Sequence, residues 1–295
     1  MSQTHSPSGK QRYGVQRVCR VWNTPRSTVY AQRRQSTAPS AKRGPRRHYT
    51  DDALATEIKQ VLEDSPFSSE GYRKVWARLR HKGVRTAQER VRRIMGERGW
   101  LAPHRPQVAR QRLHTGTITT EKPDIMWGTD MTLTVTTGEG KANVFIGVDH
   151  CTAECIGIHA SRKADRFEAL EPIRQGVRDR FGGFAEDIAM GLSVRHDHGS
   201  NYMSRDFQDE LKWLGIEPSP SFVRQPEGNG CAERFIRTLK ENLLWIHYFA
   251  TIEELRLALI DFMHKYNNEW LIQRHGYRTP AEQRKHCQQA DAKAA

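Results

Sequence analysis

The run MWGTDMTLTVT at residues 126–136 is the first stretch of the chain that is rich in β-prone residues. Two further runs follow it, NVFIGVDH at 143–150 and ECIGIHA at 154–160, with Gly138-Glu139-Gly140 before the first of them. Short β-prone runs divided by glycine-containing turns are typical of consecutive antiparallel strands. We therefore expect a three-stranded antiparallel meander.

Helices and strands alternate after this meander. The predicted elements are a helix at 164–181, a strand at 192–197, a helix at 203–215, a strand at 217–223, and two helices at 231–249 and 251–267. Pro172 is expected to kink the first of these helices or to delay its start. This order predicts an α/β domain with a mixed five-stranded sheet and flanking helices.

The N-terminal part of the chain has helical patterns instead. Residues 13–34 predict a helix-turn-helix, with Pro25 in the first turn of the second helix. Residues 50–101 predict three more helices, and Thr86 with Glu89 forms a capping-box pattern at the start of the third. An all-α segment is therefore expected before the α/β domain.

The charge divides the chain in the same way. The whole sequence has 47 Lys and Arg against 34 Asp and Glu, a formal net charge of +13. Residues 1–120 hold 25 of the basic and 8 of the acidic residues, so the excess of positive charge lies in the N-terminal part. Such asymmetry favours binding of a polyanion, and nucleic acid in particular, although basic surfaces also serve solubility.

The third predicted helix of residues 50–101 is the candidate DNA-reading element. Arg90, Arg92 and Arg93 lie on its polar face, and Arg85 comes just before it. A short helical unit whose last helix is rich in arginine suits insertion into the major groove. The alternative is an ordinary solvated helix face.

Three acids stand at positions suited to phosphodiester chemistry. Asp130 lies within the first strand, Asp197 ends the fourth, and Glu233 lies early in a helix that follows a glycine-rich segment. These positions can converge at one edge of a sheet, where the repulsion among the carboxylates would be relieved by divalent cations. Two Mg²⁺ (or Mn²⁺) ions about 3.5–4 Å apart are the expected cofactors. Taken singly, each acid also has an ordinary structural explanation as a turn cap, an edge residue or a surface residue.

Three motifs carry a family resemblance. They are Trp127-Gly-Thr-Asp130, Asp197-x-Gly-Ser-x-Tyr202 and Gly228-Asn-Gly-x-x-Glu233-Arg-Phe, with 35 residues between Asp197 and Glu233. The order and spacing of these motifs resemble the catalytic domain of the DDE transposases in the retroviral-integrase superfamily. More narrowly, the chain resembles the OrfB protein of bacterial insertion sequences of the IS-three type, whose helix-turn-helix segment is similar to residues 50–101.

The resemblance implies a fold, a reaction and a set of site residues. It implies an RNase H-like fold, with Asp130, Asp197 and Glu233 as catalytic residues and metal ligands. It implies DNA strand cleavage and strand transfer at the ends of a mobile element, that is, transposition and DNA integration by a polynucleotidyl transferase. Double-stranded DNA would be the partner, with a homo-oligomer assembled on it and a possible fusion to an upstream reading frame.

Two basic residues follow Glu233 on the same helical face, at four and seven residues. The family places a basic residue at the position of Lys240, where it would contact DNA near the active site. Arg237 is a second candidate for DNA contact. Its alternative role is an ion pair with Glu233 one turn away, worth only about 0.3–0.5 kcal/mol.

These observations divide the chain into segments. We expect a basic helix-turn-helix and linker at 1–49, a helix-turn-helix DNA-binding domain at 50–101, a linker at 102–123, an RNase H-like catalytic domain at 124–285 and a tail at 286–295. The five cysteines are scattered, and no apolar run reaches the length of about 20 residues that a membrane span needs. We therefore expect a cytoplasmic, DNA-associated bacterial protein without disulfides.

Two other functions fit the same sequence. A nuclease of the same fold would cleave DNA without joining it, and a DNA-binding regulator would use the α/β domain only as a scaffold. The complete set of three acids argues against the regulator, because an inactive relative would readily lose one of them.

Overall fold

The computed structural model describes residues 3–35, 49–68, 70–103, 118–221 and 229–294. The chain divides into two compact units, Met1–Thr50 and Asp51–Ala295. The first unit contains α1 (Gly14–Val21) and α2 (Arg26–Gln35), which confirms the predicted pair of helices. Its one buried apolar side chain among the described residues is Cys19.

The second unit begins with a group of three helices, α3 (Asp51–Glu63), α4 (Tyr72–His81) and α5 (Gln88–Glu97). Their apolar faces meet in a small core that includes Leu54, Ile58, Leu79 and Met95, none of them more than marginally exposed. This confirms the helices expected at 50–101.

The capping box predicted at the start of α5 is wrong. The N-cap residue is Ala87, and no side chain caps the helix. The backbone oxygen of Thr86 instead accepts a hydrogen bond of 2.8 Å from Nε1 of Trp76 in α4. Packing of the indole against this turn therefore decides where the helix begins.

The remainder of the second unit is built on one sheet. Its strands are β1 (Met126–Thr136), β2 (Gly140–Asp149), β3 (Cys155–Ser161), β4 (Ser193–His196) and β5 (Glu217–Pro220). The strand order is β3-β2-β1-β4-β5. The first three strands pair antiparallel, and β4 and β5 join β1 in parallel, so the mixed five-stranded sheet is confirmed.

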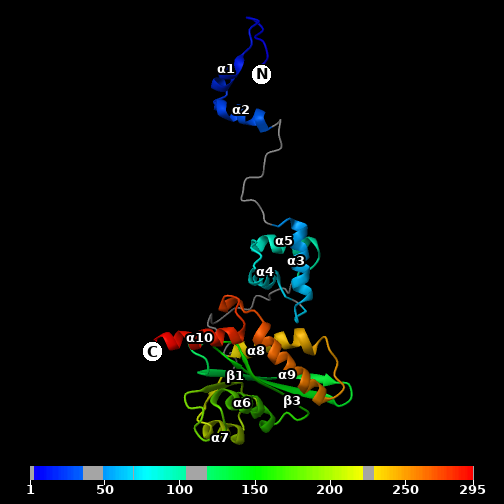
Figure 1. Cartoon of the computed structure of the whole chain (residues 1–295), viewed down its shortest axis with the longest axis vertical. Helices are drawn as coiled ribbons and strands as arrows, with labels where there is room; N and C mark the ends of the chain where they lie inside the picture. Colours follow the sequence, from blue (N-terminus) through cyan, green and yellow to red (C-terminus); the bar gives the residue numbers. More distant parts are fainter. Residues whose placement is uncertain (1–2, 36–48, 69, 104–117, 222–228, 295) are drawn as a thin grey trace. The chain divides into compact units, whose positions relative to one another are not determined.

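Helices cover both faces of this sheet (Figure 1). They are α6 (Arg166–Phe181), α7 (Arg205–Trp213), α8 (Gly230–Leu239), α9 (Ile252–Glu269) and α10 (Pro280–Ala294). One core packs α8 and α9 against β2 and β3, and includes Val144, Phe235 and Tyr266. The other packs α6 and α7 against the opposite face, and includes Trp127 and Phe207. This three-layer arrangement is the RNase H-like architecture predicted from the sequence.

Helix α6 starts earlier than its proline predicted. Asp165 caps it by accepting hydrogen bonds from the backbone of Phe167 and Glu168, and the helix runs through Pro172. A Cβ on Gly157 of β3 would lie 2.1 Å from the carbonyl oxygen of Pro172. Close packing of α6 on β3 at this glycine therefore holds the helix on both sides of the proline.

Two other boundaries differ from the sequence expectation. The helix predicted at 231–249 is divided, because α8 ends at Leu239 and a π-helix, η2 (Lys240–Leu244), follows it. The expected tail at 286–295 is helical up to Ala294, so the predicted boundary after residue 285 falls inside α10. The last part of the fifth predicted strand, at 222–223, lies outside the described residues.

Thr251 caps α9, since its side chain accepts a hydrogen bond of 3.1 Å from the backbone of Glu254. All five cysteines are free. Among the described helices, none combines the length and the apolar character that crossing a bilayer requires.

Candidate active site

The pairing of β1 with β4 places two of the predicted acids side by side. The parallel register runs from Met126 opposite Ser193 to Gly128 opposite Arg195. Continued by two residues, this register sets Asp130 beside Asp197, on strands about 4.8 Å apart. Because both residues follow the paired positions by the same number of steps, their side chains leave the sheet on the same face.

The third acid reaches this edge from α8, which packs on β1 and β2. Glu233 lies in the first turn of that helix, and its side chain is exposed. Asp197 and Glu233 both raise the pKa of Asp130 by electrostatic repulsion. The three carboxylates therefore interact, although they are separated by up to about a hundred residues of sequence.

Asp130 is the most perturbed of the three acids. Burial, with smaller contributions from the charges of Asp197 and Glu233, raises its pKa to about 6, against opposing contributions from the backbone hydrogen bond of Met131 and from the charge of Lys240. One oxygen accepts a hydrogen bond of 2.7 Å from the backbone of Met131. Burial also raises the pKa of Glu233, and the positive charge of Arg237 opposes that shift. The three carboxylates therefore carry more negative charge than the positive charge of Lys240 and Arg237 compensates.

Asp197 is exposed at the end of β4, and the loop after it is held by local hydrogen bonds. Its Oδ1 accepts a hydrogen bond of 2.8 Å from the backbone of Gly199. The neighbouring histidines are occupied elsewhere. His196 is buried against Tyr202 and Phe207, and His198 contacts the carbonyl of Ser221 at 2.5 Å.

Tyr202 is a site residue to which sequence reasoning gave no role beyond its place in the second motif. It is 3% exposed, and its ring packs on Phe207 with centroids 5.3 Å apart. Burial raises its pKa, and the charges of Asp130 and Asp197 raise it further, so its hydroxyl stays protonated below the acid pair. Its motif position was the available signal, but only the fold shows that it lies under both acids.

The donor chemistry of this edge fits a hard divalent cation. Carboxylate oxygens are the ligands that Mg²⁺ prefers, and a bound cation would relieve the repulsion that raises the pKa of Asp130. Within the described part of the chain, however, no three His, Cys, Asp or Glu side chains are gathered closely enough to form a ready metal cluster. The fold brings the acids to one edge without closing them into a complete ligand shell.

The two basic candidates next to Glu233 are placed differently. Lys240 opens η2 and lowers the pKa of Asp130, so its charge acts on the acid edge. Arg237 is exposed in α8. Across the described residues it forms no ion pair with Glu233 within 4.0 Å, so the pairing considered as its alternative role is not formed.

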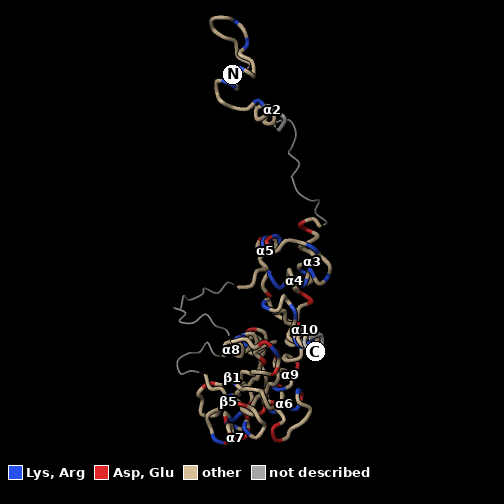
Figure 2. The backbone as a smooth tube through the Cα atoms, turned by 90° about the vertical axis from the view of Figure 1, so that its left-hand side faces the viewer, with Lys and Arg blue, Asp and Glu red and all other residues tan. Residues whose placement is uncertain are grey.

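The arginines of α5 are largely engaged within their own helical group. Arg90 and Arg93 each contact Asp51 of α3 at 2.6 Å, and Arg93 also contacts Glu97. Arg92 contacts Glu89 at 3.2 Å. Figure 2 shows the acidic and basic positions side by side along α5. Arg85, before the helix, is exposed and has no ion pair among the described residues. The DNA contacts of these four arginines remain predictions.

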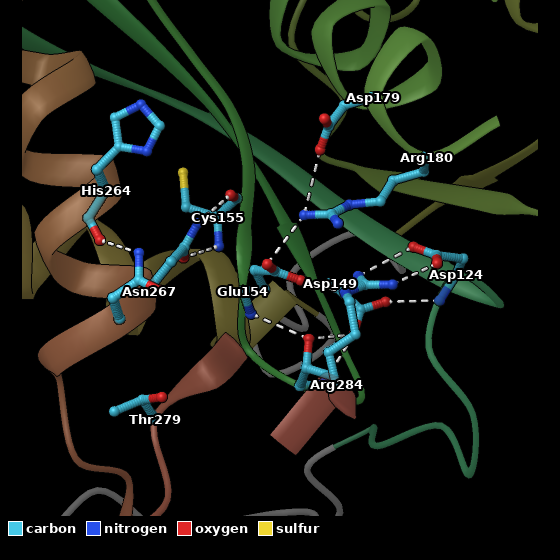
Figure 3. A network of polar contacts seen from close by, with 12 residues as sticks. Asp124, Asp149, Glu154, Cys155, Asp179, Arg180, His264, Asn267, Thr279 and Arg284 are labelled. Carbon is cyan, nitrogen blue, oxygen red and sulfur yellow. Dashed lines mark hydrogen bonds and ion pairs between the residues drawn. The ribbon is translucent and has the colours of Figure 1, made fainter. Parts of the chain in front are cut away.

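A second acidic cluster lies on the other side of the same strands. The chain segments that meet there are the start of β1, the turn between β2 and β3, α6 and α10 (Figure 3). Arg284 of α10 donates hydrogen bonds to Glu154 and Asp124, and Arg180 contacts Glu154 at 2.9 Å. Asp149 accepts hydrogen bonds from Thr152 and from the backbone of Asp124. These acids are neutralised within the fold, which gives them a structural role.

Three models of known protein families match parts of the chain. Residues 50–108 match a family model described as "HTH-like domain". Two models described as "Integrase core domain" match residues 120–226 and 214–280.

Several relatives are named as transposases. The transposase for insertion sequence element IS629 of Shigella sonnei is 27% identical over 286 residues, which cover 94% of this chain and 93% of the relative. The transposase InsD for insertion element IS2 of Escherichia coli is also 27% identical, over 92% of this chain and 90% of the relative. Among solved structures, the catalytic core domain of BIV integrase matches with a TM-score of 0.42 at 18% identity, over 57% of this chain and 99% of that domain.

The sheet, its acid edge and the two matching core models define an integrase core protein. Within that class, the HTH-like domain before the core and the relatives along nearly the whole chain assign it to the insertion-sequence transposases, as the motifs predicted.

Proposed function

We propose that this chain is a DDE transposase that cleaves the ends of a mobile element and joins them to target DNA. The observation that carries the proposal is the parallel register of β1 and β4, which, continued by two residues, sets Asp130 within β1 beside Asp197 just after β4, with Asp197 and Glu233 both contributing to the raised pKa of Asp130. In the proposed reaction, water breaks a phosphodiester bond at the element end and frees a 3′-hydroxyl. That hydroxyl then attacks a target phosphodiester, and the target's own 3′-hydroxyl leaves.

Asp130, Asp197 and Glu233 are the proposed catalytic residues and metal ligands. When bound there, two Mg²⁺ (or Mn²⁺) ions would activate the attacking oxygen and stabilise the leaving one. Tyr202 of the second motif packs its buried ring on Phe207 and is proposed to hold the loop after Asp197 in place.

The remaining residues serve to bind and position DNA. Lys240 and Arg237 are proposed to contact phosphates next to the acids, because both lie one or two helical turns after Glu233. The HTH-like domain, with Arg85, Arg90, Arg92 and Arg93, is proposed to hold the element end. A homo-oligomer assembled on DNA in the bacterial cytoplasm, and a fusion to an upstream reading frame, complete the proposal.

Incubation of the purified chain with duplex DNA from the ends of its element and Mg²⁺ tests this function. We expect nicked and joined products from the natural chain. Cleavage without joining would identify a nuclease, and DNA binding without either product would identify a regulator.

Asp197→Asn is the decisive variant. It should bind the same DNA with unchanged affinity and lose both products, with rates lower by more than about 10³-fold, because residues that act as one unit fail together. Asp209→Asn, an exposed acid of α7 paired with Arg205, is the matched control and should keep full activity. Strand transfer by Asp197→Asn would refute the assignment of the acids.

A further inference from the structure

The first and third sequence motifs touch each other at Asn229. This residue directly precedes α8 and is 6% exposed. Its Nδ2 donates a hydrogen bond of 2.8 Å to the backbone oxygen of Thr129 in β1. Thr129 is followed by Asp130, and Asn229 lies one helical turn before Glu233. The bond therefore joins the two elements that carry these acids.

Asn229 is not used as a helix cap. Asparagine is among the favoured N-cap residues because its side-chain oxygen can accept a hydrogen bond from the first turn. At α8 this bond is absent although Asn229 stands at the N-cap position. Its Oδ1 is buried and finds no partner among the described residues. The hydrogen bond from its amide nitrogen to β1 holds this side chain in place.

Gly128 provides the space for this contact. A Cβ at that position would lie 2.5 Å from Oδ1 of Asn229 and 2.8 Å from Nε2 of His150. Real Cβ atoms do not approach other atoms so closely, so any side chain at Gly128 would displace Asn229. His150 has little room to yield, because its Nδ1 contacts the carbonyl of Ile118 at 3.0 Å and its backbone N–H donates to Met126.

We infer that Asn229 is a positioning residue whose side-chain amide fixes the start of α8 against β1 and thereby sets Glu233 relative to Asp130. The inference rests on the proposed function, and it deepens it by explaining Gly128 and Asn229 of the first and third motifs. Asn229 acts through the acids and is not proposed to touch DNA.

Asn229→Ala and Gly128→Ala disrupt the contact from its two sides. Each should lower the cleavage rate about 10–100-fold and raise the Mg²⁺ concentration needed for half-maximal rate, as loss of residues that orient metal ligands does. DNA binding should not change. Hydrogen exchange at residues 233–236, the first amides that are hydrogen-bonded within α8, should become faster in both variants, because the start of α8 is no longer held to the strand.

The double variant separates positioning from general damage. Once Asn229 is alanine, the Oδ1 that a Cβ at Gly128 would meet is gone and only the contact with His150 remains, so the double variant should lose less rate than the two single losses combined. Additive losses would overturn the inference. Asn143→Ala is the matched control, since this buried side chain also donates to backbone oxygens, of Ser161 and Arg162, but away from the acids. It should lower stability and leave the Mg²⁺ requirement unchanged.

The inference fails if the natural chain makes product and Asn229→Ala matches it in rate, Mg²⁺ requirement and hydrogen exchange. If the natural chain makes no product, the proposed function fails instead. Hydrogen exchange then still decides the inference, since unchanged protection of α8 in Asn229→Ala overturns it and faster exchange supports it.

Discussion

Two groups of three acids lie on or next to the strands of the sheet, and they differ in how their charges are compensated. Arg284 pairs with Asp124 and Glu154, and Arg180 also pairs with Glu154, while Asp149 beside them accepts hydrogen bonds from Thr152 and from the backbone of Asp124. Asp130, Asp197 and Glu233 interact with one another, and the charge of Lys240 is the main one that opposes their effect on Asp130. Acids of the same type are thus structural in one group and unsatisfied in the other.

The difference shows whether the positive charge that compensates each group of acids comes from the protein or from solution. A buried acid paired with arginine is compensated within the chain, so it needs nothing from solution. An acid whose pKa is raised by burial and by two other carboxylates gains most from a cation that the chain does not provide. The unpaired group is therefore the one suited to a metal-dependent reaction on DNA.

The largest expected effect comes from breaking the paired group. Arg284→Ala leaves Glu154 and Asp124 with uncompensated charge in a site where Arg284 itself is 6% exposed. The free energy of unfolding should fall by about 3–5 kcal/mol. Urea unfolding measures this change. Arg205→Ala, which removes an exposed pair with Asp209, is the control and should cost less than about 1 kcal/mol. Equal effects of the two variants would contradict the comparison.

Removing the charge of Asp130 from the unpaired group should instead raise the free energy of unfolding. The pKa of Asp130 is about 6 in the folded chain against 3.8 for the free group, so the folded state binds more protons between these values. The contribution of Asp130 to the free energy of unfolding therefore falls as the pH rises from about 4 to 6. Above pH 6 the full destabilising effect of its charge is present. Without metal, Asp130→Asn should be more stable than the natural chain at pH 7.5, by about 1–3 kcal/mol, and inactive.

Urea unfolding in the presence of a chelator at pH 7.5 and at pH 4 checks this prediction. The gain should shrink at pH 4, where Asp130 is protonated in the folded state and its pKa in the unfolded chain, 3.8, is close to the pH. Added Mg²⁺ should stabilise the natural chain more than the variant. A gain of the same size at both pH values would show that charge repulsion is not its cause.

The smallest expected effect concerns the arginines around α5, which also differ in whether an acid of the same fold pairs with them. Arg85 is exposed without an ion pair in the described structure, whereas Arg90 is held by Asp51 with its side chain 15% exposed. Arg85→Ala should weaken duplex binding a few-fold and reduce the slope of log affinity against log salt by about 1. Arg90→Ala should mainly lower the stability of the α3–α5 group. Titrations at several salt concentrations distinguish the two, and a larger salt effect of Arg90→Ala would reverse the assignment.

The strands and most helices could be predicted from the sequence because their signals are local. The β-prone run that begins at Met126 and the capping residue Thr251 mark element boundaries by their own chemistry. The errors came where a distant contact overrides a local signal. Pro172 stays inside α6 because β3 supports that helix, and Thr86 does not cap α5 because its turn serves Trp76.

The candidate site was predictable to the level of residue type and spacing. Asp130, Asp197 and Glu233 stand out as acids in places where pattern alone does not require them. Neither Asn229 nor Tyr202 could be given a role in this way. Their contacts join segments that are far apart in the sequence, and a buried amide or phenol gives no periodic signal.

By itself the sequence determined which elements form, which half of the chain is basic and which acids are candidates, since composition, periodicity and motif spacing are properties of neighbouring residues. The tertiary structure alone decided which acids are neutralised and which are not. That outcome depends on where Arg284, more than a hundred residues away, is placed by the folding of α10 against the turn at Glu154.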